Sequence, residues 1–61
     1  MILEFYTNKK YNLKVYINAQ KVNSIEKGTG EYTRIHFDNG TKVSVEDSIE
    51  YVVEQIKKAL K

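Results

Sequence analysis

The chain has no cysteine, no proline and no tryptophan, and its 61 residues include only one histidine and three glycines. The absence of cysteine excludes disulfides and thiolate metal sites. One histidine cannot build a metal centre unless several carboxylates gather around it. We therefore expect no metal and no cofactor. A chain this short must be held together by good local structure or by self-association.

Long apolar runs are also missing, since no stretch approaches the roughly 18 residues that a membrane-spanning helix needs. The segment from Met1 to Phe5 lacks the basic region and the cleavage site of a secretion signal. Ten Lys and Arg residues against eight Asp and Glu give a net charge of only +2, whereas a nucleic-acid-binding domain of this size usually carries a denser basic cluster. We expect one cytoplasmic domain over residues 1–61, with no membrane interaction.

What the sequence does contain is a series of alternating apolar and polar residues, which is typical of strands with one buried face. Residues 2–7 and 10–18 are predicted to be the first two strands, joined by a tight turn at Asn8-Lys9. Residues 22–27 are a less regular third strand, because Val22 and Ile25 are three apart. A bulge or a short helical turn at Val22 would reconcile that spacing. Residues 32–37 are predicted to be the fourth strand.

The dipeptide Asn39-Gly40 is the strongest local signal in the sequence. A type I′ turn needs positive φ at both central residues, and this pair tolerates that conformation at the least cost. Alternating apolar residues stand on both sides of it, ending in Val43 and Val45. The pattern predicts a hairpin between the fourth and a fifth strand.

A helix is predicted to begin near Asp47. Asp47 and Glu50 have the spacing of a capping box, in which each can satisfy a free N–H group of the first turn. Ser44 and Asp47 have a similar spacing and offer an earlier start. The apolar residues that follow recur at helical spacing and form one stripe: Ile49, Val52, Val53, Ile56 and Leu60.

These elements predict an α+β domain of the ββββα type. An antiparallel sheet of about five short strands, made of two hairpins and a middle strand, is packed by one C-terminal helix. The expected core consists of Leu3, Phe5, Leu13, Val15, Ile17, Val22, Ile25, Ile35, Phe37, Val43, Val45 and the helix stripe. The hydrophobic gain of so small a core roughly matches the entropy lost on folding. A homodimer is therefore one expected state.

The polar residues do not converge as catalysis requires. His36 and Asp38 share a face of the fourth strand, but two ligands do not make a metal site. The adjacent Glu46 and Asp47 are explained by helix capping. Gly28-x-Gly30 lacks the third glycine of a dinucleotide-binding loop, and the serines have no nearby base. We expect no enzymatic activity.

A set of aromatic and basic residues points away from the helix on the predicted sheet. Tyrosine and arginine are enriched at the energetic centres of protein interfaces. Aromatic residues interleaved with cations on an open sheet also bind single-stranded nucleic acid. Alternatively, the tyrosines are there only because they form strands well. The set comprises Tyr6, Lys14, Tyr16, Tyr32, Arg34 and His36.

A second candidate surface is the outer face of the helix. Tyr51 lies roughly opposite the apolar stripe, beside Glu54, Gln55 and Lys58. A lone exposed tyrosine is ordinary, but this patch can also contact a partner. A third candidate is an open edge strand, either the first or the third, which could pair with another chain.

Several segments resemble the FlbD/SwrD-like family of small bacterial flagellar and swarming-motility proteins. The matching residues are Ile17-Asn18-Ala19, Val22-x-Ser24-Ile25-Glu26, Asp38-Asn39-Gly40-Thr41-Lys42-x-x-Val45-x-Asp47-Ser48 and Val52-Val53-Glu54-x-Ile56. The resemblance implies a strand-rich unit closed by one helix, without a catalytic role. The chain departs from the family at its first turn, Thr7-Asn8-Lys9, and before the fourth strand, at Gly30-Glu31-Tyr32-Thr33.

Three interpretations of function follow. The first is a small non-catalytic protein-interaction module that binds and modulates or inhibits a larger bacterial protein. The Lys-, Asn-, Ile- and Tyr-rich composition is common in phage and mobile-element proteins that block host machines such as defence nucleases. The second is a single-stranded nucleic-acid binder that uses the sheet face, and the third is an accessory protein of flagellar or swarming motility.

Overall fold

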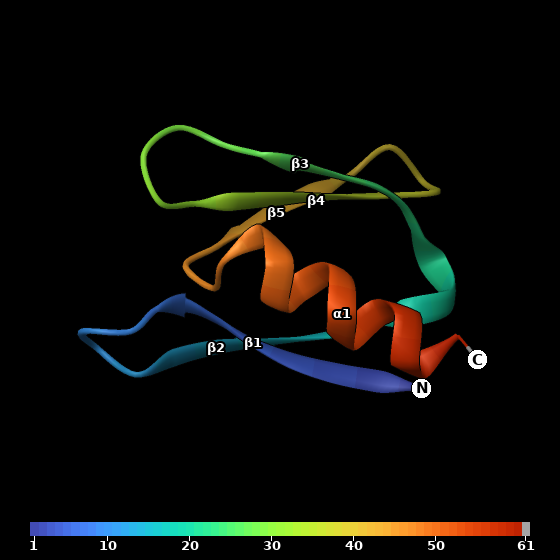
Figure 1. The fold of residues 1–61 in the computed structure, drawn as a ribbon, viewed down its shortest axis with the longest axis horizontal. Coiled ribbons are helices and arrows are strands. Elements are labelled where there is room, and N and C mark those ends of the chain that lie inside the picture. Colours follow the sequence, from blue (N-terminus) through green and yellow to red (C-terminus); the bar gives the residue numbers. More distant parts are fainter. Residues whose placement is uncertain (61) are drawn as a thin grey trace.

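The computed structural model describes residues 1–60 and shows an α+β fold of five antiparallel strands and one C-terminal helix (Figure 1). The strands form two sheets instead of one. The first sheet is the hairpin of β1 (Ile2–Asn8) and β2 (Leu13–Asn18). The second has the order β3-β4-β5, with β3 at Val22–Lys27, β4 at Thr33–Phe37 and β5 at Lys42–Val45. Helix α1 spans Ile49–Ala59.

The first hairpin is confirmed, but its predicted turn is wrong. β1 continues to Asn8, and residues 9–12 form the connection. The Asn12 N–H donates to the Lys9 carbonyl at 3.2 Å, and Asn12 has a φ of 56°. Asparagine tolerates this left-handed conformation better than most residues because its short polar side chain bonds locally. The Asn8 side chain also accepts from the Tyr11 N–H at 3.1 Å, so it caps the loop without lying at its centre.

The expected irregularity at Val22 is present. A one-turn 3-10 helix, η1 (Ala19–Lys21), precedes β3, and the Asn18 side chain caps it by accepting from the Gln20 N–H at 3.0 Å. The β3–β4 register then shifts between Val22 and Ser24. This bulge returns Val22 and Ile25 to the buried side of the sheet.

The β4–β5 hairpin is confirmed, although its turn is not of type I′. The Gly40 N–H donates to the Phe37 carbonyl at 3.1 Å, and only Gly40 in this turn has positive φ, at 86°. A three-residue loop of this kind is a type I turn followed by a glycine bulge. The Asn39 side chain accepts from the Thr41 N–H at 3.1 Å, a role that needs no positive φ at Asn39.

The helix cap is Ser48 instead of Asp47. The Ser48 hydroxyl accepts from the Tyr51 N–H at 3.2 Å, and the helix begins at Ile49. The predicted capping box fails because both acidic residues before the helix are engaged with the first hairpin. Asp47 accepts from the Tyr6 N–H at 2.9 Å, and Glu46 accepts from the Lys9 N–H.

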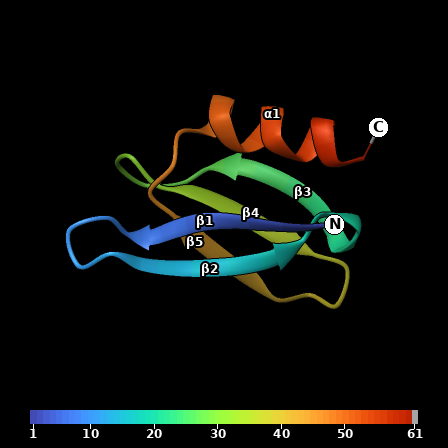
Figure 2. The same ribbon diagram turned by 90° about the horizontal axis from the view of Figure 1, so that it is seen from below.

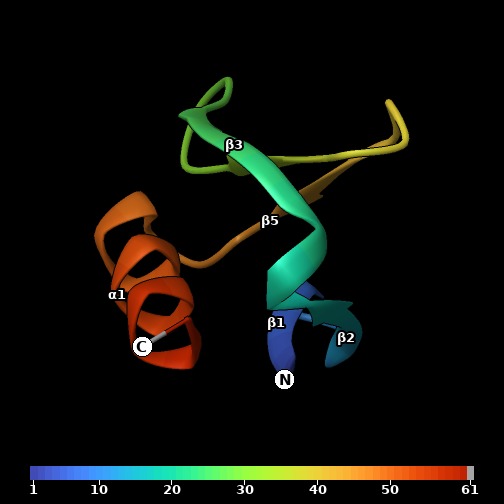
Figure 3. The same ribbon diagram turned by 90° about the vertical axis from the view of Figure 1, so that its right-hand side faces the viewer.

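These bonds join the two sheets at one corner. The Glu46 N–H donates to the Tyr6 carbonyl at 2.7 Å, and the Asp47 carboxylate takes the place of the next strand carbonyl by accepting from the Tyr6 N–H. The sheets separate beyond that corner, and α1 lies along the open side next to β1, away from β2 (Figures 2 and 3). The helix therefore fills the gap between two sheets instead of covering one sheet face.

The core lies between the sheets and the helix. Its buried apolar side chains are Phe5, Ile17, Ala19, Ile35, Val45, Val52 and Ile56. Thr33 is also buried, and its hydroxyl donates to the Asp47 carbonyl at 2.7 Å. Two residues predicted to be in the core are outside it, since Leu13 is 54% exposed and Leu60 is 53% exposed. Leu13 is the first residue of β2, next to the hairpin loop, and Leu60 follows the last residue of α1.

Candidate functional site

The outer hairpin face consists of the β1 and β2 side chains that point away from the core. In the antiparallel register Ile2 lies opposite Asn18, Glu4 opposite Tyr16, and Tyr6 opposite Lys14. We use the name for these six residues. Directly opposed side chains on one face of a sheet are within contact distance. The strands thus bring together Tyr6, Lys14 and Tyr16, three of the residues predicted to bind a partner.

Lys14 holds the centre of this face. Its ammonium lies 3.3 Å from the Glu4 carboxylate and 5.3 Å from the centre of the Tyr6 ring. The hydrogen bond and the charge of Glu4 raise the pKa of Lys14 above its usual value, with a smaller contribution from Tyr6. The cation is therefore matched within its own hairpin, whereas Tyr16, 64% exposed, is not covered by its neighbours.

Arg34 and His36 lie on the outer face of the second sheet. The Glu26 carboxylate on β3 accepts from Arg34 at 3.2 Å and lies 2.7 Å from His36 Nε2. The hydrogen bonds from His36 and then Arg34 hold the pKa of Glu26 below its usual value. Tyr32 stands just before β4 and is 42% exposed. This face is a small ion-paired cluster with one aromatic residue at its margin.

The six side chains predicted to share one sheet face are divided between two faces. The buried side chains of both sheets point into one core. Their outer faces consequently look in opposite directions, with the hairpin on one side of the molecule and β3-β4-β5 on the other (Figure 1). Tyr6, Lys14 and Tyr16 cannot form one platform with Tyr32, Arg34 and His36.

Exposed apolar side chains are concentrated on the first hairpin. Of the eight large apolar side chains that are exposed among residues 1–60, five belong to it: Met1, Ile2, Tyr11, Leu13 and Tyr16. The other three, Tyr32, Tyr51 and Leu60, are scattered over the rest of the molecule. Ile2 and Tyr16 share the outer hairpin face, whereas Leu13 points to the inner face and Tyr11 lies in the connection. Single exposed apolar residues are normal on a protein surface, whereas a contiguous group on one face marks a binding surface.

The predicted helix surface is only partly an outer face. Glu54 and Lys58 are exposed and form an i, i+4 ion pair at 3.3 Å. Tyr51 is 46% exposed, but its ring packs edge-on against Phe5, with 6.2 Å between the ring centres. Gln55 is half-buried. Tyr51 thus closes one side of the core, which limits its freedom to bind a partner.

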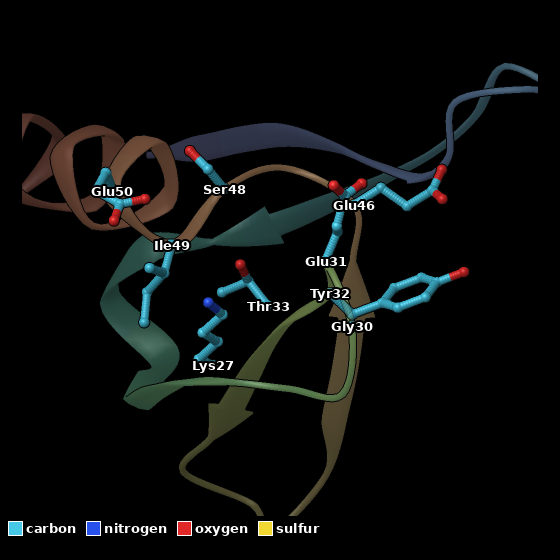
Figure 4. Close-up of a pocket in the computed structure, with 9 residues that line it drawn as sticks. All are labelled: Lys27, Gly30, Glu31, Tyr32, Thr33, Glu46, Ser48, Ile49 and Glu50. Atoms are coloured by element: carbon cyan, nitrogen blue, oxygen red, sulfur yellow. The ribbon is translucent and has the colours of Figure 1, made fainter.

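A shallow pocket of about 390 Å³ lies between the β3–β4 turn and the start of α1 (Figure 4). Three of its nine lining residues are glutamates, Glu31, Glu46 and Glu50, and one is Lys27. The labelled side chains surround a broad depression, and Tyr32 extends away from Lys27 and Ile49 (Figure 4). Glu46 is already bonded to the first hairpin. The pocket offers a mixed polar surface without a convergent set of reactive groups.

Within residues 1–60, no cluster of three or more His, Cys, Asp or Glu side chains could hold a metal ion. In the same part of the chain, none of the helical structure is long and apolar enough to cross a membrane. Comparison of the chain with family models, curated proteins and solved structures gives no match. The relation to FlbD/SwrD-like proteins stays a prediction.

The sequence-based search missed several exposed apolar residues of the hairpin. Ile2 could have been found, because the alternation that turns Leu3 and Phe5 inward places Ile2 outward with Glu4. The exposure of Tyr11 and Leu13 was not predicted, because the alternation assigns both side chains to the inner, buried face of the second strand. For Leu13 that assignment is correct for direction, but Leu13 lies next to the hairpin loop and is exposed.

Proposed function

We propose that the chain is a non-catalytic protein-interaction module that binds and modulates a larger bacterial protein through the outer hairpin face. The observation that carries this proposal is the exposure of Tyr16 and Ile2, at 64% and 62%, on the outer hairpin face. Tyrosine provides a large, stiff contact area and is enriched among the residues that dominate binding energy. Ile2 lies diagonally beside Tyr16 in the register and extends this apolar area.

A role without catalysis is supported by the way in which the acidic residues are used. Asp47 and Glu46 bind backbone N–H groups of the hairpin. Glu26 and Glu4 are ion-paired on opposite faces of the molecule. A general acid or base needs a proton partner within reach and a substrate position beside it. These four carboxylates are engaged by donors of the chain itself.

The test is affinity capture from bacterial lysate with matched variants. Tyr16→Ala and Tyr6→Ala truncate the outer hairpin face, whereas Tyr32→Ala truncates an exposed tyrosine of the other sheet. We expect a defined protein to be captured by the wild type and by Tyr32→Ala, and to be lost with Tyr16→Ala. The affinity for the purified partner should fall by about 30-fold or more, as for a residue at the energetic centre of an interface. Equal capture by all variants would show that the outer hairpin face is not the binding surface.

Binding of single-stranded nucleic acid has less support. Such sites combine stacked aromatic residues with a groove of free positive charge. Here Lys14 is paired with Glu4, and Arg34 with Glu26, while the tyrosines lie on opposite sides of the molecule. We expect no salt-sensitive binding when fluorescence anisotropy is titrated at two salt concentrations. A strongly salt-dependent affinity would favour the nucleic-acid function instead.

A further inference from the structure

The edge of β2 that faces away from β1 is free. Within residues 1–60, no strand pairs with the side of β2 that faces away from β1, and α1 lies on the opposite side of the hairpin (Figures 2 and 3). An uncovered edge presents N–H and C=O groups that can pair with another strand. Natural proteins usually blunt such an edge with a bulge, a proline or unpaired charges.

The edge of β3 shows these protective features, and that of β2 does not. β3 carries the bulge between Val22 and Ser24, and its exposed side chains are polar. β2 runs in regular register against β1 from Asn18 to Lys14. Its one charged side chain, Lys14, is neutralised by Glu4. Its other strongly exposed side chains are Leu13 and Tyr16.

The backbone groups that face this edge can be assigned. The Ala19 N–H donates to the Met1 carbonyl at 3.0 Å. In an antiparallel ladder, hydrogen-bonded and non-bonded pairs alternate. The odd-numbered residues of β2, such as Val15 and Ile17, therefore bond to β1. Lys14 and Tyr16 direct their N–H and C=O groups to the free edge.

We propose that β2 pairs, antiparallel, with β2 of a second copy of the chain, with Val15 on the two-fold axis. This register pairs the even-numbered residues, as the free backbone groups require. It places Lys14 opposite Tyr16 of the second copy, twice by symmetry, and a cation beside a tyrosine ring is attracted to its face. On the inner side it places Leu13 opposite Ile17 of the second copy, which gives the exposed Leu13 an apolar neighbour.

Other registers fit less well. A shift by one residue would set core-facing side chains against outward-facing ones. A shift by two residues in one direction puts the two Lys14 side chains opposite each other, and like charges in that position destabilise a sheet. A shift by two in the other direction removes both Lys14–Tyr16 pairs and leaves Leu13 opposite the small side chain of Ala19. The sequence of β2 is thus complementary to itself in one register.

The inference goes beyond the proposed function, because its partner is the chain itself. It would set the two outer hairpin faces side by side.

Sedimentation equilibrium of the pure protein tests the proposal. A single strand of six residues on each side makes a small interface, and such interfaces below about 1,200 Å² are usually weak. We expect the average mass to rise from 7.1 kDa towards twice that value as the concentration approaches about 1 mM. A constant mass of one chain throughout this range would overturn the inference.

Tyr16→Lys is the decisive variant. Within one chain the new lysine faces Glu4, which favours the monomer fold, while in the dimer it faces Lys14 of the second copy. We expect the dissociation constant to rise about tenfold, since two like-charge pairs are created. Tyr32→Lys makes the same change on the other sheet and should leave association as in the wild type. An unchanged dissociation constant for Tyr16→Lys would place the contact elsewhere.

The double variant Lys14→Glu with Tyr16→Lys tests the register. It sets opposite charges against each other across the two-fold axis, so association should return to within about threefold of the wild type. Failure to recover, with the far-ultraviolet circular dichroism of the wild type retained, would overturn the register. These experiments are done on the pure protein, without a larger partner. A negative result therefore does not test the proposed role of the outer hairpin face. In the same way, failure to capture a partner from lysate does not test the dimer.

Discussion

The β1–β2 hairpin and the β3-β4-β5 sheet both bury one face in the common core, but they differ in the side chains that they expose to solvent. The second sheet exposes an ion-paired cluster, and its outer strand is interrupted by a bulge. The hairpin exposes Ile2, Leu13 and Tyr16 and ends in an uninterrupted edge. We propose that this difference reflects binding by the hairpin.

The attachment of the two regions also differs. β4 is paired along its length on both sides, whereas the hairpin is joined to the second sheet by a few bonds around Tyr6, Glu46 and Asp47. Its main support is the burial of Phe5 and Ile17 in the shared core. The hairpin should therefore open at a lower free energy than the second sheet.

The largest expected effect is on the free energy of unfolding, and it distinguishes Phe5 from Leu13, although the alternation assigned both to the core. Phe5→Ala should lower the free energy of unfolding by about 3–5 kcal/mol, because Phe5 is 1% exposed and links the hairpin to α1. Leu13→Ala should change it by less than about 0.5 kcal/mol at low protein concentration, where the chain is a monomer. Urea unfolding measures both. A large loss for Leu13→Ala would mean that the hairpin tip is packed.

The next effect concerns the corner between the sheets. Asp47→Ala removes the acceptor of the Tyr6 N–H, and an unpaired backbone group of this kind costs about 1–3 kcal/mol. Asp38→Ala, in the exposed β4–β5 turn, is the matched control and should be nearly neutral. Amide exchange should show loss of protection mainly in β1 and β2. Equal loosening of both sheets would contradict the weaker attachment of the hairpin.

The turns of the two regions give a third contrast. Gly40 has a φ of 86° with open space around its Cα, so Gly40→Ala should cost about 1–2 kcal/mol through backbone conformation alone. Asn12 also has positive φ, and Asn12→Gly should be tolerated with little change. Thermal unfolding of the two variants checks this. A neutral Gly40→Ala would mean that the turn can adopt another geometry.

The smallest effect is the pH dependence of the two ion-paired faces. The pKa of Glu26 is lowered by folding, so its stabilisation is present above the unfolded value of about 4.3 and is lost as the pH falls through the folded value. The pKa of Lys14 is raised, so its contribution is complete below about 10.4 and is lost as the pH rises through the folded value.

Unfolding temperatures across the pH range should therefore respond differently in two variants. Glu26→Gln should flatten the acid side of the profile, and Lys14→Gln the alkaline side. Because both groups are near the surface, each change should be small and should decrease further in high salt. If both variants changed the same side of the profile, the assignment of the two pairs would be wrong.

The sequence predicted the structural features that depend on residues close together in the chain. The spacing of Val22 and Ile25 indicated the bulge, Asn39-Gly40 indicated a hairpin, and the stripe around Val52 indicated the helix. The turn types were wrong, because Asn39 and Asn8 bind with their side chains in ways that composition alone does not distinguish. The helix cap was wrong because Asp47 has a partner, the Tyr6 N–H, that lies 41 residues away in the chain.

The candidate surface was only partly predictable for the same reason. Alternation correctly turned Tyr6, Lys14 and Tyr16 outward. It could not show that Arg34 and His36 lie on the opposite side of the molecule from these residues, since that depends on the division of the strands into two sheets. Nor could it show that Leu13, next to the hairpin loop, is exposed.

The central claim about the hairpin edge is that β2 pairs through it with β2 of a second copy of the chain. Its most direct test is amide hydrogen exchange, resolved by residue, at low and high protein concentration. At low concentration the Lys14 and Tyr16 amides should exchange quickly while those of Val15 and Ile17 are protected. At high concentration Lys14 and Tyr16 should gain protection, and the edge amides of Ile25 and Lys27 on β3 should not. If Lys14 and Tyr16 are equally protected at every concentration, or if protection appears on β3 instead, the account is contradicted.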